Sequence, residues 1–177
     1  MPRYLRPRRS GAMIFFTIAL AQRDSHLLVA EVEQLRQAVH DTRAERPFGI
    51  EAWVVLPDHL HCIWRMPEGN ADYATRWRLI KARFSRGVEP GPRRASHVVR
   101  GERAVWQRRF WEHHIRDEAD FVAHLRYCRF NPVKHGLVAR PRDGHSPRST
   151  ARSAGHYGNG HHAPYACYAV HLHPHHG

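Results

Sequence analysis

The chain has 177 residues, enough for one domain with a hydrophobic core. Its 28 Lys and Arg against 16 Asp and Glu give a net charge of +12, and its three cysteines have no paired spacing, which argues against a disulfide framework or a cysteine metal site. No apolar stretch is long enough to cross a bilayer. These features favour a protein of a reducing compartment with a polyanionic partner, for which nucleic acid is the default choice.

The basic residues recur along the whole chain, so the charge is expected to belong to the folded surface. The alternative is that the charge serves solubility alone, although arginine would then usually be matched by more acid. The candidate DNA contacts are Arg8, Arg9, Arg76, Lys81, Arg83, Arg108, Arg109 and Lys134.

The N-terminal stretch imitates a secretory signal, because basic residues precede an apolar run from 12 to 21. The same run equally predicts a first strand over 12–20, which fits a basic cytoplasmic protein better. Apolar spacing then predicts helices over 25–43 and 72–86, and a third that opens at Asp117 and stops at Asn131 before Pro132. Strands are predicted over 48–56, 60–66 and 105–115, the first two forming a hairpin around Pro57 and Asp58. Residues 89–103 are expected to form a loop.

His59 and His61 are two residues apart in a predicted strand, so their side chains point to the same face and could share one metal ion. The alternative is a half-exposed strand that happens to carry two histidines, since the chain holds 17. Tyr127 and Asn131, four residues apart, lie on one face of the predicted third helix and could face the histidine strand. On the residues alone, however, Tyr127 is interpreted as a packed core tyrosine. The cluster of Glu112, His113 and His114 is interpreted as surface or supporting residues rather than catalytic ones.

Several segments in fixed order resemble the REP-associated tyrosine transposases, a group of single-tyrosine HUH enzymes in which two histidines flank a hydrophobic residue. These segments are Phe15-Phe16-Thr17, residues 47–61 ending in Pro57-Asp58-His59-Leu60-His61, residues 79–85, Trp106 to Glu112, and Tyr127 to Val138. The similarity spans about residues 10–142.

The resemblance implies an α+β fold, a ferredoxin-like antiparallel sheet with packed helices, which agrees with the predicted order of elements. It implies that His59 and His61 are metal ligands, that Asn131 supplies a third, and that Mg²⁺ or Mn²⁺ is the cofactor. It also implies that Tyr127 is the nucleophile, which forms a 5′-phosphotyrosine intermediate. The implied substrate is single-stranded DNA with hairpins formed by palindromic repeats. The expected setting is the cytoplasm, associated with the nucleoid and not with a membrane, and the expected oligomer is a monomer or a homodimer.

The resemblance ends near Arg142, so residues 1–142 are predicted to form the transposase domain with a basic N-terminal arm. Residues 143–177 are predicted to be a disordered, His-rich tail, because the composition from Gly144 onwards cannot bury much surface. A frameshift near Asp143 is one explanation for this tail. Two other functions stay open at this point: a non-catalytic nucleic-acid-binding relative that keeps the fold and the charge, and a metal-handling protein built on the tail.

Overall fold

The structure, a computed structural model, describes residues 11–89 and 104–140. Four strands form an antiparallel sheet in the order β2-β3-β1-β4. This arrangement, with helices packed on the sheet, confirms the predicted α+β fold. The strands are β1 (Met13–Ala19), β2 (Gly49–Val55), β3 (His59–Arg65) and β4 (Trp111–His114), and the helices are α1 (Leu27–Ala30), α2 (Val32–Glu45), α3 (Tyr73–Arg86) and α5 (Glu118–Lys134).

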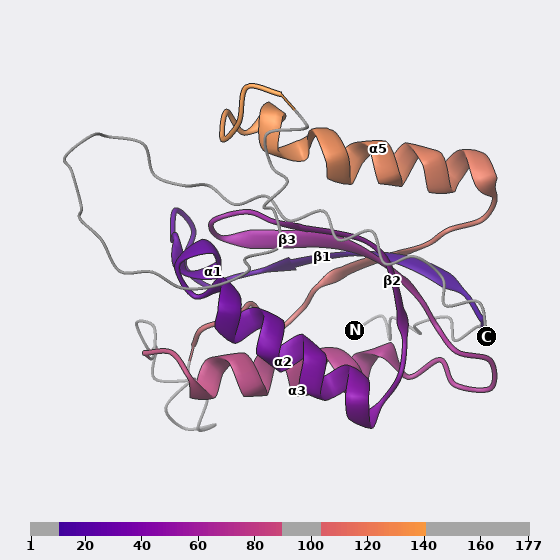
Figure 1. The fold of residues 1–177 in the computed structure, drawn as a ribbon, viewed down its shortest axis with the longest axis horizontal. Helices are drawn as coiled ribbons and strands as arrows, with labels where there is room; N and C mark the ends of the chain where they lie inside the picture. The colour runs from indigo at the N-terminus through magenta and orange to yellow at the C-terminus, as the bar shows by residue number, and fades with distance from the viewer. Residues whose placement is uncertain (1–10, 90–103, 141–177) are drawn as a thin grey trace, which may run out of the picture.

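The sheet separates two helical layers. Figure 1 shows α2 and α3 on one face of the sheet and α5 alone on the other. The strands alternate accordingly: Phe16 packs with Trp64 and Trp77 on the α3 side, whereas Phe15 belongs to a smaller cluster with Cys128 on the α5 side. Successive residues of β1 therefore serve opposite faces.

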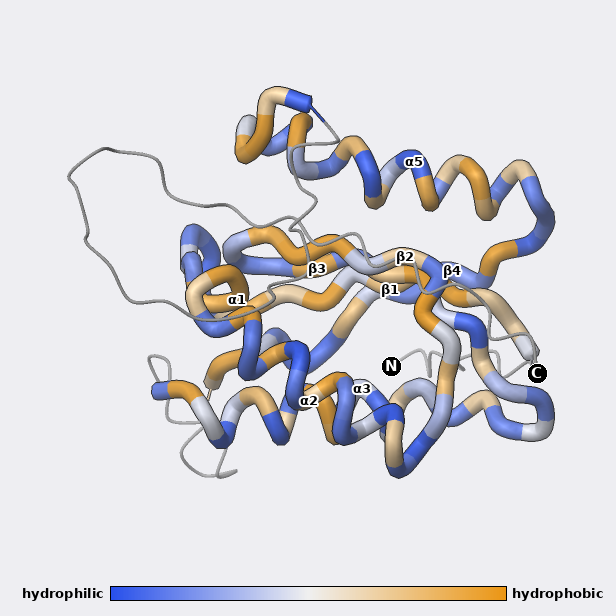
Figure 2. Tube along the Cα trace, in the orientation of Figure 1, coloured by the Kyte–Doolittle hydropathy of each residue, from blue (hydrophilic) through white to orange (hydrophobic). Residues whose placement is uncertain are grey.

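The larger core lies between the sheet and α2 and α3. Its aromatic centre is closely packed, with the Trp64 and Trp77 ring centroids 4.3 Å apart. Figure 2 shows that hydrophobic residues are concentrated in the strands, whereas hydrophobic and polar residues alternate along the helices. This pattern suits strands that are covered on both faces and helices with one solvent face. Within the described residues, no helix is long and apolar enough to cross a membrane.

The sequence located the elements well but missed three details. The helix predicted over 25–43 is divided at Glu31 into α1 and α2. Glu31 departs from helical geometry (φ −107°, ψ 33°). In the first turn of α1, the backbone N–H of Leu28 donates to the Pro57 carbonyl (3.1 Å) and ties α1 to the β2–β3 turn.

The strand predicted over 105–115 is a strand only at β4, and Trp106 forms an isolated bridge with Leu20. The Gln107 carbonyl accepts a hydrogen bond from Lys81 (2.8 Å), so α3 contributes to its pairing. Helix α5 does not stop before Pro132 but continues to Lys134. The proline lies in the last turn, where its missing N–H interrupts few helical hydrogen bonds.

The N-terminal arm, most of the predicted loop and the predicted tail lie outside the described residues. The domain boundary at 142 therefore stays a prediction.

Candidate active site

The two histidines of β3 lie side by side on the face of the sheet that α5 covers. Strand alternation turns His59 and His61 the same way, and their ring centroids are 5.0 Å apart. β3 is an inner strand, paired with β1 on one side and β2 on the other, so both histidines are held by a rigid part of the fold. The two histidine side chains therefore lie next to each other on one face of the sheet, as strand alternation predicted.

Each histidine is oriented by a hydrogen bond at Nδ1. His59 Nδ1 lies 2.6 Å from Asp58 Oδ1, and because an ionised carboxylate only accepts, Nδ1 carries the proton and Nε2 keeps a lone pair. His61 Nδ1 lies 2.8 Å from the Thr17 hydroxyl of β1, and the tautomer that donates there also leaves Nε2 unprotonated. Such outer partners orient metal-binding histidines in proteins.

His61 is held in the neutral form by its surroundings. It is buried in the sheet, and this burial is the main cause that lowers its pKa to about 3, with smaller coulombic contributions from His59, His135 and Lys134. The pKa of Asp58 is also lowered, since its hydrogen bond and charge interaction with His59 outweigh its partial burial. At neutral pH the pair therefore combines a neutral imidazole at His61 with an anionic carboxylate behind His59.

Tyr127 projects from α5 toward this pair. Its ring contacts His61 edge-on, with centroids 5.0 Å apart, and lies 5.8 Å from Phe15 of β1. Lys134 Nζ lies 5.9 Å from the centre of the same ring, within range of a cation–π contact. Tyr127 is 43% exposed, so it is not the packed core tyrosine of the alternative interpretation. Its ring is anchored against the sheet while part of the side chain is open to solvent.

Asn131, one turn beyond Tyr127, is buried, and within the described residues neither atom of its amide has a hydrogen-bond partner. The Nε2 atom of His61 is in the same condition. Buried polar atoms without partners are costly and rare, and they are expected where a ligand or ion completes the site. An imidazole nitrogen and an amide oxygen are both donors to divalent metal ions, so these residues fit the implied metal.

His135 is a neighbour of the pair that the sequence did not single out as a functional residue. Its ring lies 5.3 Å from that of His59, and burial lowers its pKa. Both residues line a cavity of about 370 Å³ that also includes Asp58 and Arg23. His135 belongs to the Asn-Pro-Val-Lys-His-Gly segment, which was noted in the sequence. Its position next to His59, however, depends on how α5 crosses the sheet.

A second missed group joins β4 to α5. Asp120 accepts hydrogen bonds from His113 Nε2 (2.9 Å) and Arg116 Nε (3.2 Å), and His124 Nδ1 lies 3.1 Å from the same carboxylate. These hydrogen bonds lower the pKa of Asp120, His113 contributing most. A metal ion can be held by three or more His, Cys, Asp or Glu side chains that lie close together. Among the described residues, His113, Asp120 and His124 form the one group of this kind. His124 also lines a cavity of about 330 Å³ with Tyr127.

Two of the predicted DNA contacts are engaged inside the protein. Arg76 is 1% exposed, and its guanidinium donates to the carbonyls of Arg46 (3.2 Å) and Pro47 (3.0 Å), which fixes the start of β2 against α3. Arg83 donates to the Thr42 hydroxyl (2.6 Å) and pairs with Glu45. Both side chains hold α3 against the preceding segments, so neither is carried forward as a phosphate contact.

The other predicted contacts are better placed. Arg108, Arg109 and Lys134 are exposed, and Lys81 lies beside Trp106 and Phe110. Arg8 and Arg9 lie outside the described residues. The structure therefore leaves basic side chains near both the tyrosine and α3.

Comparisons with known proteins identify relatives that cover most of the chain. A REP-associated tyrosine transposase of Escherichia coli (strain K12) is 43% identical over 143 residues, which cover 81% of this chain and 79% of the relative. A relative from Haemophilus influenzae, whose own assignment to that family is provisional, is 38% identical over 145 residues, covering 81% of this chain and 82% of the relative.

A solved structure of a REP-associated tyrosine transposase bound to a REP hairpin has a TM-score of 0.68 and 43% identity, covering 81% of this chain and 79% of that one. No family model matches the chain. The identity and coverage are sufficient to decide the family: this chain belongs to the REP-associated tyrosine transposases.

Proposed function

We propose that this protein cuts and rejoins single-stranded DNA next to a hairpin, with Tyr127 as the nucleophile and His59, His61 and Asn131 as metal ligands. The observation that supports this most is the edge contact between the exposed Tyr127 ring and His61, with centroids 5.0 Å apart. A related protein has been solved with a REP hairpin, which supports a hairpin-bearing substrate.

The chemistry follows from the properties of a phenol. A free tyrosine hydroxyl has a pKa of about 10 and is a weak nucleophile at neutral pH. In the proposed step the Tyr127 hydroxyl gives up its proton to water, its oxygen bonds to phosphorus, the bond from phosphorus to the 3′ oxygen breaks, and the released 3′ oxygen takes up a proton from water. Tyr127 then holds the 5′ phosphate. A second 3′ hydroxyl can reverse the step and rejoin the strand, because the phosphotyrosine keeps the energy of the phosphodiester.

The protein's own residues hold the parts in place. Phe15 packs against both His61 and Tyr127, with ring centroids 5.6 and 5.8 Å away, so it fixes the tyrosine relative to the histidine strand. Lys134 supplies a positive charge beside the tyrosine, where the phosphate would approach. When bound at the histidines and Asn131, Mg²⁺ or Mn²⁺ would withdraw charge from the scissile phosphate.

The test is a covalent adduct assay. The parent, incubated with labelled hairpin-bearing single-stranded DNA and Mg²⁺ or Mn²⁺, should give a shifted band on a denaturing gel. Tyr127→Phe should fold and bind the DNA but give no band. Tyr73→Phe is the matched control, since Tyr73 is buried on the opposite face of the sheet and should leave the adduct intact.

His61→Ala should behave differently from Tyr127→Phe. It should slow adduct formation by weakening metal binding, and excess Mn²⁺ should restore part of the rate. An adduct that persists in Tyr127→Phe would remove this residue from the mechanism. A parent that binds hairpin DNA but forms no adduct with either metal would favour the alternative, a non-catalytic relative.

A further inference from the structure

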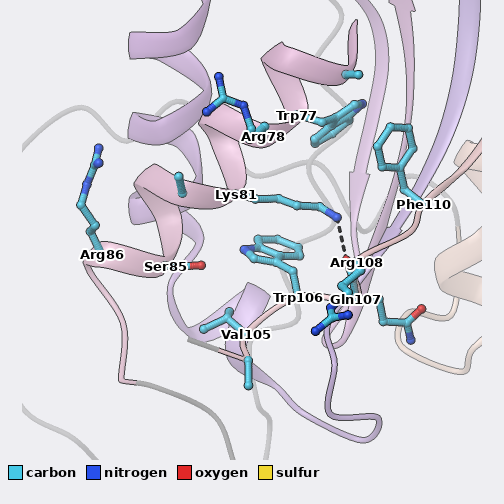
Figure 3. Close-up of a pocket in the computed structure, with 13 residues that line it drawn as sticks. Trp77, Arg78, Lys81, Ser85, Arg86, Val105, Trp106, Gln107, Arg108 and Phe110 are labelled. Atoms are coloured by element: carbon cyan, nitrogen blue, oxygen red, sulfur yellow. Dashed lines mark hydrogen bonds between the residues drawn. The ribbon is translucent and has the colours of Figure 1, made fainter. Parts of the chain in front are cut away.

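A cavity that the proposed chemistry does not use lies on the opposite face of the sheet, between α3 and residues 104–110. It has a volume of about 580 Å³, within the range of roughly 300–1,000 Å³ typical of ligand pockets. Figure 3 shows Lys81 of α3 extending past the Trp106 ring toward Phe110. We call this cavity, lined by α3 and residues 104–110, the α3 groove.

The lining of the α3 groove combines positive charge with aromatic surface. It includes four basic residues and three aromatic ones, and no acidic residue among the described lining. The basic residues are Arg78, Lys81, Arg86 and Arg108, and the aromatic ones are the buried Trp77 and the partly exposed Trp106 and Phe110. This is the composition that single-stranded nucleic acid requires, with cations for the backbone and ring faces for the bases.

The groove also has room and free charge. Ala74, Ala82 and Ser85 are small residues that line the same side of α3, which leaves space between the helix and Trp106. Arg78 and Arg86 of α3 also line the groove, and both are exposed; in Figure 3 their guanidinium groups point away from the Trp106 ring, toward solvent. Within the described part of the chain, no hydrogen bond or ion pair engages either guanidinium. Trp106 is partly exposed and offers a ring for stacking.

The groove is connected to the proposed active site around the edge of the sheet. Phe110 lines the α3 groove, and the next residue, Trp111, lines the cavity that contains Tyr127. Trp111 begins β4, which is an edge strand, and it is 53% exposed. A strand of DNA can therefore pass from one cavity to the other over β4 without crossing the body of the protein.

We propose that the α3 groove binds the single-stranded nucleotides that flank the hairpin, while the scissile phosphate lies at Tyr127 on the other face. The inference rests on the proposed function and specifies which part of the substrate the second face recognises. The double-stranded stem is not expected to bind in the α3 groove, because only unpaired bases can stack on the partly exposed rings of the groove.

The experiment compares two labelled DNAs, a bare hairpin and the same hairpin with a single-stranded extension, by fluorescence anisotropy. It uses Tyr127→Phe protein without divalent metal, so that binding is measured apart from cleavage. The extension should increase affinity. Adding Arg78→Gln and Arg86→Gln should reduce affinity for the extended DNA by roughly tenfold and flatten its salt dependence, whereas bare-hairpin affinity should not change. Arg36→Gln, at an exposed arginine of α2, is the control and should have little effect.

A second measurement locates the contact directly. DNA with 5-iodouracil in the extension should photocrosslink to Trp106, in the tryptic peptide of residues 104–108. Equal loss of affinity for both DNAs, or a crosslink only from the stem, would place the duplex in the groove and overturn the inference. No gain from the extension would overturn it as well. Failure of the parent to form a covalent adduct would refute the proposed cleavage but would leave this binding result standing.

Discussion

The substitution Asn131→Leu distinguishes between two roles of the Asn131 amide, as a metal ligand or as a group that stabilises the fold. Leucine has the same branched shape but no polar atoms. Because both amide atoms of Asn131 are buried without a partner, the metal-free protein bears a penalty of about 1–3 kcal/mol at this position. Removing the amide should therefore leave the metal-free protein as stable as the parent, or more stable by up to about that amount.

The same substitution should remove the response to metal. At a free metal concentration of about 100 times Kd, binding stabilises a folded protein by about 2.7 kcal/mol. For a chain of this size each kcal/mol corresponds to about 2–4 °C in melting temperature. The parent should thus melt several degrees higher with Mn²⁺ or Mg²⁺, whereas Asn131→Leu should show little shift.

The assay is thermal unfolding of both proteins with and without metal. Asn70→Leu is the control, because the Asn70 amide oxygen accepts from Arg76 Nη1 (3.0 Å) and from the Asp72 N–H (3.0 Å). That variant should lose stability equally in both conditions. If Asn131→Leu instead destabilises the metal-free protein by more than about 1 kcal/mol, the amide has a structural partner and the reasoning fails.

Three further predictions concern the histidine and the basic surface. Thr17→Val should weaken metal binding by roughly 10–100-fold, measured by titration calorimetry, because it removes the hydrogen bond that orients His61. Arg108→Gln with Arg109→Gln should weaken DNA binding and its salt dependence without changing metal affinity; a fall in metal affinity would contradict this. His61 has a lowered pKa, so in acid the unfolded chain binds a proton that the folded protein does not. Metal-free stability should therefore fall as pH drops from about 6.5 toward 3, by about 2 kcal/mol at pH 5, and urea unfolding should show less of this loss in His61→Leu.

The sequence was sufficient where one local rule decides the geometry. Strand alternation placed His59 and His61 on one face, and the residue order placed the hairpin around Pro57 and Asp58. The role of Arg76 could not be predicted in this way. On the sequence it is one more basic residue of a helix, but its partners are the carbonyls of residues 46 and 47, about thirty positions earlier. Such pairing depends on how distant segments pack.

The same reason explains the missed residues of the site. Thr17 matters because β1 pairs with β3 in a register that sets it opposite His61. His135 matters because α5 crosses the sheet near His59, and Asp120 because α5 begins next to β4. The spacing of residues within one helix or strand does not show which residues of other elements they will contact.

The two consecutive phenylalanines of β1 connect the proposed active site to the α3 groove. Phe15 contacts His61 and Tyr127 on one face, while Phe16 contacts Phe110, which lines the groove, on the other (ring centroids 5.9 Å apart). Both are almost fully buried in the sheet, so neither can shift without disturbing its layer. The sheet that separates the groove from the tyrosine is therefore closely packed on both faces. If flanking nucleotides bind in the groove, this sheet sets how the groove is placed relative to Tyr127, and it thereby contributes to the position of the cut relative to the hairpin.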